Sequence, residues 1–377
     1  MGVLYGGRSG EHEVSLRSAA TVIGALDPAR YEVVPIAITK DGRWLTGPES
    51  LRLLDEAQRT LSPVVEHGDE VLLAPVPGRG GLVPASGGAV TVGLDVVFPV
   101  LHGTYGEDGT IQGLLEMAGI PYVGAGVLAS SAGMDKAVMK ALFRDADLPG
   151  CRWLLVRPER ESAADVRLRV ERELGFPCFV KPCNLGSSVG VAKVRTADEL
   201  AAALTEAADY DPRVIIEEAV DARELECGVL GNVPAEASVV GELIPSHEFY
   251  DYVDKYVDDR VRIVIPAEVP ANVAQSVREL AVRAFDAVDA SGLARVDFFL
   301  ECTTDRLLVN EINTMPGFTS ASMYPRLWGA SGVALPALVD RLIGLALARH
   351  ATRTRRRLSF SPPERLSASS RSSRAGR

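Results

Sequence analysis

Two short stretches near the end of the chain, Arg295-Val-Asp297 and Asn310-Glu-Ile-Asn313, decide the fold. Each places polar residues at every second position, and successive side chains of a β-strand point to opposite faces. The stretches flank a short polar turn at residues 302–306. Together they predict a β-hairpin that carries its polar groups on one face.

The register of this hairpin follows from the position of its turn. Centring the turn on Thr304 places Asp297 opposite Glu311 and Arg295 opposite Asn313. Two carboxylates directly opposite each other repel, and a bound cation removes that conflict. The pairing therefore predicts a metal site between Asp297 and Glu311.

The ligand types indicate which metal would bind. Carboxylate and amide oxygens, with no His or Cys, are hard ligands that suit magnesium together with phosphate groups. A charged hairpin exposed to solvent is the alternative, but it does not explain the apolar run Phe298-Phe-Leu300. We therefore expect a magnesium site that binds a phosphorylated ligand.

Three lysines add a cationic side to this prediction. Lys136 lies on an expected helix, Lys181 ends an expected strand, and Lys255 lies in an aromatic loop at residues 249–256. Each alone is typical of a solvated surface. With the metal hairpin, they indicate a triphosphate that is neutralised from several sides.

The segment Gly186-Ser-Ser-Val-Gly190 matches the G-x-S-x-G pattern of serine hydrolases. That nucleophile elbow requires a strand directly before it and a helix directly after it. Here Pro182 and Asn184 interrupt the approach, and residues 191–194 read as a second strand. A strand, a Gly/Ser loop and a strand instead favour a flap whose backbone N–H groups cover phosphates.

A weaker signal indicates where a nucleotide base would bind. Residues 215–220 read as a strand, Ile-Ile-Glu-Glu-Ala-Val, with two adjacent glutamates at 217 and 218, and Glu224 follows Glu217 by seven positions. Main-chain groups of this segment could contact adenine, and a carboxylate could hold the ribose hydroxyls.

Strands and helices alternate along the chain, which predicts an α/β protein with a parallel sheet in its first third. The expected helices there are about 14–25 and 110–118, and residues 41–90 are read as an insertion without a clear period. Later helices are expected at about 134–143, 164–174, 273–290 and 335–348, and a capping box at 196–199 indicates another helix that ends near 208. We divide the chain into an N-terminal domain (1–123), a central domain (124–212), a C-terminal domain (213–352) and a basic disordered tail (353–377).

Composition sets further limits. The 377 residues carry 47% hydrophobic side chains and a net charge of −10, which predicts a globular protein that binds neither nucleic acid in bulk nor a membrane. The tail holds eight arginines and one acidic residue, and we read it as a disordered end rather than a nucleic-acid site. Five cysteines without metal or redox spacing predict a reduced, cytoplasmic protein with all five thiols buried.

Seven ordered motifs, spanning roughly residues 1–350, resemble the D-alanine–D-alanine ligases of the ATP-grasp superfamily. They are Gly6-Gly7 with Glu11-His-Glu-Val-Ser15, Leu101-His-Gly103, Gly106-Glu-Asp-Gly-Thr110, Met134-Asp-Lys136, Lys181-Pro-Cys-Asn-Leu-Gly-Ser-Ser-Val-Gly190, Tyr250-Asp-Tyr252 with Lys255-Tyr256, and Arg295-Val-Asp297 with Asn310-Glu-Ile-Asn-Thr-Met-Pro-Gly-Phe-Thr319. The resemblance implies a three-domain ATP-grasp fold with a Rossmann-like N-terminal domain. It also implies that ATP activates one D-alanine as an acyl phosphate, which a second D-alanine attacks.

The resemblance assigns roles residue by residue. Catalytic groups would be Glu13, Ser187, Tyr256, Arg295 and Gly317. The substrates would be bound by Glu13, His102, Ser322 and Met323. ATP would be bound by Lys136, Lys181, Ser187, Ser188, Glu217, Glu218, Val220, Glu224 and Lys255. Two magnesium ions, or manganese in their place, would be held by Asp297, Glu311 and Asn313.

Two alternatives remain open at this point. A D-alanine–D-lactate ligase shares the superfamily and takes a hydroxy acid as its second substrate, and a non-catalytic ATP-binding regulator could share the fold. The resemblance also implies a homodimer. Glu218 stands where family members often have a lysine, and Cys183 stands in the flap where a small residue is usual.

Overall fold

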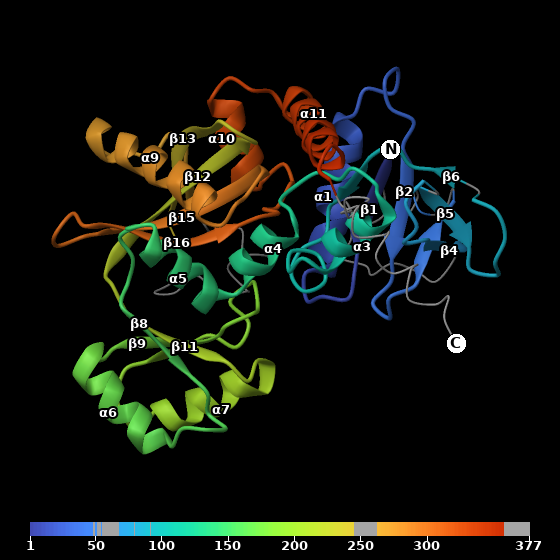
Figure 1. The fold of residues 1–377 in the computed structure, drawn as a ribbon. Helices are drawn as coiled ribbons and strands as arrows, with labels where there is room; N and C mark the ends of the chain where they lie inside the picture. The colour runs from blue at the N-terminus through green and yellow to red at the C-terminus, as the bar shows by residue number, and fades with distance from the viewer. Residues whose placement is uncertain are drawn as a thin grey trace, which may run out of the picture.

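The structure is a computed structural model that describes residues 1–47, 50, 54, 68–78, 80–90, 92–244 and 262–357. Its described strands form three sheets of seven, four and five strands (Figure 1). Helices cover each sheet, as expected for an α/β protein.

The N-terminal sheet has the strand order β6-β5-β4-β3-β2-β1-β7. Its bounds are β1 Gly2–Gly6, β2 Val34–Ile38, β3 Trp44–Thr46, β4 Asp69–Leu73, β5 Gly81–Pro84, β6 Val92–Gly93 and β7 Val97–Pro99. Strand β1 pairs in parallel with both β2 and β7, so the predicted parallel core is confirmed. The described part of the 41–90 insertion adds short antiparallel strands to one edge of this sheet.

Helices α1 (His12–Ala25) and α3 (Thr110–Ala118) belong to this unit. The bounds of α3 are those that the sequence predicts. Helix α1 begins two residues earlier than expected, directly after Glu11, which occupies its N-cap position.

The expected helix at 134–143 is wrong in one respect. The chain forms two helices, α4 (Val127–Met134) and α5 (Lys136–Asp145), that meet at Asp135. The Asp135 side chain accepts a hydrogen bond from the Val138 N–H, so it caps α5 and separates the two helices. Lys136 is therefore the first residue of a helix.

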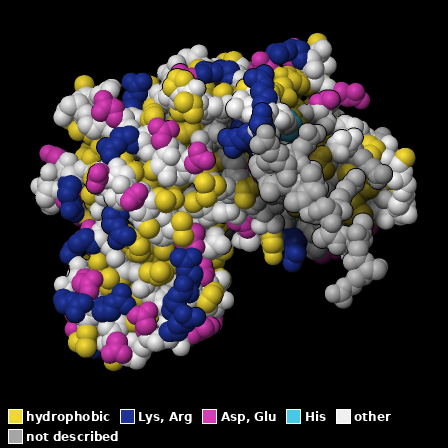
Figure 2. Space-filling model, in the orientation of Figure 1, with side chains coloured by type: hydrophobic (Ala, Val, Ile, Leu, Met, Phe, Trp, Pro, Cys, Tyr) yellow, Lys and Arg dark blue, Asp and Glu magenta, His cyan; other side chains and the backbone are white. Residues whose placement is uncertain are grey.

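The central sheet has the order β10-β9-β11-β8 and carries α6 and α7. Its bounds are β8 Trp153–Val156, α6 Ala163–Glu173, β9 Cys178–Pro182, β10 Ala192–Val194, α7 Leu200–Tyr210 and β11 Val214–Glu218. The predicted capping box is wrong, because α7 starts only after Glu199, whose carboxylate accepts the Arg195 N–H. This sheet forms a lobe on which basic and acidic side chains are interspersed (Figure 2).

The C-terminal sheet has the order β14-β13-β12-β15-β16. Its unit comprises β12 Ala222–Gly231, β13 Ala235–Ile244, β14 Arg262–Val264, α9 Ala271–Ala287, β15 Gly292–Glu301, β16 Leu307–Asn313, α10 Met323–Ala330 and α11 Leu335–Thr354. Strands β15 and β16 form the predicted hairpin around the 302–306 turn. Helix α11 runs two residues into the segment expected as tail, and residues 358–377 lie outside the described part.

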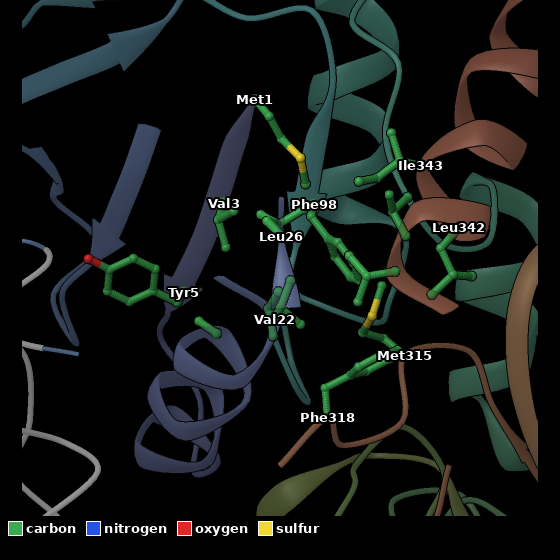
Figure 3. Close-up of a cluster of buried hydrophobic side chains, with 14 of the residues drawn as sticks. Met1, Val3, Tyr5, Val22, Leu26, Phe98, Met315, Phe318, Leu342 and Ile343 are labelled. Atoms are coloured by element: carbon green, nitrogen blue, oxygen red, sulfur yellow. The ribbon is translucent and has the colours of Figure 1, made fainter. Parts of the chain in front are cut away.

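The N-terminal and C-terminal units share one hydrophobic core. Phe98 of β7 packs edge-to-face on Phe318, with ring centroids 5.7 Å apart, and Phe318 lies 5.6 Å from Tyr324. Leu342 and Ile343 of α11 pack in the same cluster (Figure 3). We call this cluster the apolar seam.

Among the described helices, no single one has both the length and the apolar composition of a membrane span. The pair α10 and α11 reaches these values only when taken together, and the two are bent by 105°.

Candidate active site

The three units line one cavity of about 780 Å³. Most of the residues singled out in the sequence lie on its wall: His102, Lys136, Lys181, Ser187, Ser188, Glu224, Arg295, Asp297, Glu311, Asn313, Gly317, Ser322 and Met323. The cavity therefore unites residues from segments that are far apart in the chain.

The hairpin pairing at the cavity is confirmed. Asp297 lies opposite Glu311, and Arg295 lies opposite Asn313. The register shifts directly after Asp297, where a β-bulge places one extra residue on β16. The predicted pairing therefore holds from Arg295 to Asp297. From Phe298 to the turn, each residue of β15 lies opposite a residue of β16 one position earlier than predicted.

Arg295 is held in a fixed orientation. Its Nε and Nη2 donate to the two carboxylate oxygens of Asp297, both at 2.7 Å, and Nε also lies 2.9 Å from Glu226 Oε2. Burial alone would lower the pKa of this guanidinium, but the carboxylates of Asp297 and Glu226 raise it well above its ordinary value. Arg295 is therefore a permanent cation on the cavity wall.

Glu226 is a residue that the sequence reasoning missed. It lies directly across from Asp297 on β12, on the same face as Glu224, and it lines the cavity. The signal was available, because residues two apart on a strand share a face. A row of three carboxylates, from Glu226 through Asp297 to Glu311, thus crosses three strands.

The donors on the hairpin fit magnesium. Asn313 Nδ2 lies 3.0 Å from Asp297 Oδ2, so the amide stands beside the carboxylate. Among the described residues, no group of three or more Asp, Glu, His and Cys side chains qualifies as a complete metal site. Two carboxylates and an amide need further oxygens, which phosphate groups supply to magnesium in nucleotide sites.

Two predicted lysines line the cavity with defined partners. Lys136 Nζ donates to the Leu185 carbonyl at 2.6 Å, and Lys181 Nζ donates to Glu217 Oε2 at 2.8 Å. Burial lowers the pKa of Lys136, whereas the pKa of Lys181 is raised because Glu217 outweighs the effect of burial. Lys255 and Tyr256 lie outside the described residues.

The assignment of Glu13 to the first substrate does not match the geometry. Glu13 does not line the cavity, and its carboxylate pairs with Lys40 at 2.6 Å. Glu11 lines the cavity instead and accepts a hydrogen bond from Ser187 Oγ. A Cβ at Gly103 would lie 2.7 Å from Glu11 Oε2, so this glycine leaves room for the carboxylate.

Helical periodicity explains the correction. Residues two apart on a helix differ by about 200° around its axis, whereas residues four apart lie on one face. Ser15 and Ser18 are buried towards the strand ends, where Ser15 Oγ accepts the Gly6 N–H. Glu11 belongs with this face, and Glu13 points away from it.

His102 is buried and holds parts of two units together. Its Nδ1 lies 3.1 Å from the Met315 carbonyl, and its Nε2 lies 3.0 Å from Ser18 Oγ. The Phe318 N–H donates to the same Ser18 Oγ at 3.1 Å. Burial lowers the pKa of His102, so its ring stays neutral, donates from Nδ1 and accepts at Nε2.

Glu107 also lines the cavity, and the sequence reasoning gave it no role although it lies in a quoted motif. Its Oε2 accepts the Gly103 N–H at 2.8 Å. Burial, and next the negative charge of Glu11, raise the pKa of Glu107 to about 8.

The loop between β16 and α10 forms the end wall of the cavity. Ser322 is the N-cap residue of α10, and its Oγ accepts the Thr319 N–H at 3.0 Å. A Cβ at Gly317 would lie 2.8 Å from Ser322 Oγ, so the two backbone segments approach closely. Met323 begins the helix, and the first N–H groups of a helix favour anions.

On the expected nucleotide-base side, the glutamates lie in different places. Glu224 lines the cavity, whereas Glu217, Glu218 and Val220 do not. Glu218 binds the Arg152 N–H at 2.8 Å and its Nε at 2.7 Å. Neighbouring side chains of β11 point to opposite faces, which explains why Glu217 contacts Lys181 while Glu218 contacts Arg152 on the other side of the strand.

The flap is a loop between antiparallel strands β9 and β10, as predicted, so the hydrolase elbow is excluded. Ser187 and Ser188 both have positive φ values, 52° and 57°, which are uncommon for residues other than glycine. Cys183, at the base of the flap, is fully buried, and burial raises its pKa to about 12. Four cysteines are buried as expected, but Cys302 is exposed.

Two family models match the chain. The model described as D-ala D-ala ligase N-terminus matches residues 1–125, and the one described as D-ala D-ala ligase C-terminus matches residues 142–344. The chain belongs to the D-alanine–D-alanine ligase family. This family depends on ATP and uses D-alanine as a substrate.

Curated relatives agree with this membership. The chain is 49% identical to a D-alanine–D-alanine ligase of Heliobacterium modesticaldum, covering 94% of this chain and 96% of the relative. It is 50% identical to one of Mycolicibacterium vanbaalenii, covering 92% and 96%.

Solved structures show the same ATP-grasp fold. The D-alanine–D-alanine ligase of Coxiella burnetii has a TM-score of 0.80 at 36% identity, covering 94% of this chain and 95% of that one. The VanG D-Ala:D-Ser ligase of Enterococcus faecalis has a TM-score of 0.81 at 35% identity, covering 92% and 98%.

Proposed function

We propose that this ligase-family protein joins two D-alanine molecules into D-alanyl-D-alanine at the expense of ATP, for peptidoglycan precursor synthesis. The observation that carries the proposal is the cavity itself. It brings Lys136 and Lys181 together with Arg295 and Asp297, and Glu11 stands on its N-terminal wall.

The first step is the formation of an acyl phosphate. A carboxylate oxygen of the first D-alanine attacks the γ-phosphorus of ATP, and ADP leaves. Lys136 and Lys181 neutralise the phosphates, and the flap with Ser187 and Ser188 covers them. Asp297, Glu311 and Asn313 would hold magnesium, which supplies charge neutralisation at the phosphate oxygens when it is bound.

We assign the ammonium of the first D-alanine to Glu11 rather than Glu13. The support is that Glu11 lies at the cavity and is oriented by Ser187, whereas Glu13 is occupied by Lys40. His102 supports this region by fixing the 315–318 loop beside α1.

In the second step, the amine of the second D-alanine attacks the acyl carbon. The C–N bond forms and gives a tetrahedral oxyanion, which collapses as the bond from the acyl carbon to the phosphate oxygen breaks. Inorganic phosphate leaves, and the nitrogen releases a proton. Arg295 and the Gly317 N–H stabilise the oxyanion. The carboxylate of the second D-alanine binds Ser322 and the Met323 N–H at the start of α10, where an anion is favoured.

The direct test is release of ADP by the purified protein with ATP, magnesium and D-alanine. We expect ADP release that depends on D-alanine, with D-alanyl-D-alanine as the product. Absence of turnover with intact nucleotide binding would instead favour the ATP-binding regulator. Parallel reactions with D-lactate and D-serine added test the second substrate, since a D-Ala:D-Ser ligase is among the structural relatives.

We further propose that magnesium is the metal used, and that the enzyme acts as a cytoplasmic homodimer, in line with its family. Replacing magnesium with calcium in the assay tests the choice of metal. Light scattering of the purified protein tests the homodimer, and cell fractionation tests the cytoplasmic location.

A further inference from the structure

Lys140 is a buried lysine to which the proposed reaction gives no role. It lies on α5, one turn after Lys136, and only 5% of its side chain is exposed. It does not line the cavity. Its Nζ lies 3.2 Å from Glu217 Oε1 and 3.2 Å from the Asn310 carbonyl oxygen.

Glu217 is shared between two lysines. Its Oε1 faces Lys140, and its Oε2 accepts from Lys181 at 2.8 Å. The exposed side-chain fraction is 3% for Glu217 and 15% for Lys181. Burial alone would raise the pKa of Glu217, but Lys140 and Lys181 lower it to about 2, so the carboxylate is ionised.

The order of these charges has a consequence for the cavity. Lys181 lines the cavity, while Glu217 and Lys140 stand behind it. One carboxylate between two ammonium groups leaves one net positive charge. Without Lys140, the carboxylate would neutralise Lys181 alone, and the pair facing the phosphates would have no net charge.

We propose that Lys140 is a positioning residue for nucleotide binding: it engages Glu217 from behind, so that Lys181 keeps an uncompensated positive charge for the phosphates. This inference rests on the proposed ATP-dependent function. It assigns Glu217 to the charge balance of the phosphate site rather than to direct contact with ATP.

A purely structural role is the competing explanation, because Lys140 also ties α5 to Asn310 on the metal strand. The two explanations differ in what they predict for the double variant. A loss of charge balance is relieved when Glu217 also loses its charge, and it leaves adenosine binding unaffected. Distortion of β16, which holds the proposed metal ligands, is not relieved by a change at Glu217.

The experiment measures calorimetric affinities for magnesium–ADP and adenosine in the full-length wild type and in Lys140→Met, Glu217→Gln and the double variant. We expect Lys140→Met to weaken ADP binding by about tenfold, since one buried charge near the phosphates is removed, with adenosine unchanged. The double variant should recover most of the ADP affinity, because Lys181 again stands uncompensated. Lys193→Met is the matched control. Lys193, like Lys181, lies over the Phe179 ring, but unlike Lys181 it does not line the cavity.

Equal losses for ADP and adenosine, or a double variant as weak as Lys140→Met, would overturn the proposal. If Lys140→Met alone does not fold, the comparison of Glu217→Gln with the double variant decides. Glu217→Gln should then bind ADP more tightly than the double variant, because it keeps the positive charge of Lys140. Equal affinities of these two variants for ADP contradict the proposal. A wild type that binds no magnesium–ADP would contradict the ATP-dependent function itself.

Discussion

The apolar seam and the joint of the central sheet are built differently. In the seam, aromatic side chains of the N-terminal and C-terminal units pack into one core, and the chain of rings continues from Tyr324 to Trp328 at 6.4 Å. The central sheet has a hydrophobic core of its own. A small cluster of Ala137, Cys183 and Ile215 connects it to α5. Two ion pairs, Lys140–Glu217 and Arg213–Asp135, complete this joint at α5 and its N-cap.

The difference indicates that the end wall of the cavity is rigid, whereas the flap that covers the nucleotide is less firmly attached. Residues of the end wall, such as Ser322, are attached to the seam, so their geometry is set by a dense apolar core. The flap belongs to the sheet with the smaller apolar contact. Interfaces that are small and polar open at lower cost than large apolar ones. We therefore expect the flap side to move relative to the seam when nucleotide binds.

The largest effect is expected from breaking the seam. Phe318→Ala removes a fully buried ring between Phe98 and Tyr324 and should lower the free energy of unfolding by about 3–5 kcal/mol. Denaturant titration measures this. The matched control at the joint is Arg213→Gln, which removes the ion pair with Asp135 and should cost about 1 kcal/mol or less, because the arginine is partly exposed. Equal losses would contradict the distinction between seam and joint.

A smaller effect, on catalysis, is expected from Arg295→Lys. The planar guanidinium binds both oxygens of Asp297, and a lysine offers only a mobile point charge. Turnover should fall about 10²-fold or more, by comparison with the loss of oxyanion donors in other enzymes. Initial rates of ADP release measure this. Turnover within a factor of about three of the wild type would refute the oxyanion role.

The smallest effect concerns the pH dependence of stability at His102, which joins Ser18 of α1 to the Met315 carbonyl. Burial holds the pKa of His102 below its ordinary value of 6.5, so the unfolded chain binds a proton that the folded chain does not. Stability is therefore lost as pH falls below 6.5, by at most about 1.4 kcal/mol per pH unit for this group. His102→Gln should flatten the dependence of unfolding free energy between pH 6.5 and 5. Burial also lowers the pKa of His12, so His12 contributes to the pH dependence of the unfolding free energy in both the wild type and the variant. If the variant shows the same pH dependence as the wild type, His102 is not its source.

Much of the β15–β16 hairpin could be predicted because alternation and a short turn together determine which residues face each other. The bulge after Asp297 could not, since the single extra residue on β16 has no sequence signature there. Local capping chemistry decided other differences. Asp135 divides one expected helix into two, although an aspartate before a helical pattern is a known start signal.

The sequence predicts Glu13 rather than Glu11 for a different reason. Two glutamates stand in the same motif, and only the helical phase of α1, visible through Ser15 and Ser18, separates them. Lys140 was overlooked because a lysine on an amphipathic helix reads as a solvated charge. Its burial depends on Glu217, which lies 77 positions later in the chain.

The bulge between Asp297 and Phe298 also bears on how this protein could be engineered. Between it and the turn, the buried side chains of Phe298, Leu300, Leu308 and Val309 fix the hairpin register independently of the turn. The turn itself, around exposed Cys302 and Thr304, lies at the far end of the hairpin from the carboxylate pair. A peptide tag or a fluorescent label can therefore be introduced there while the spacing of Asp297 and Glu311 stays as it is.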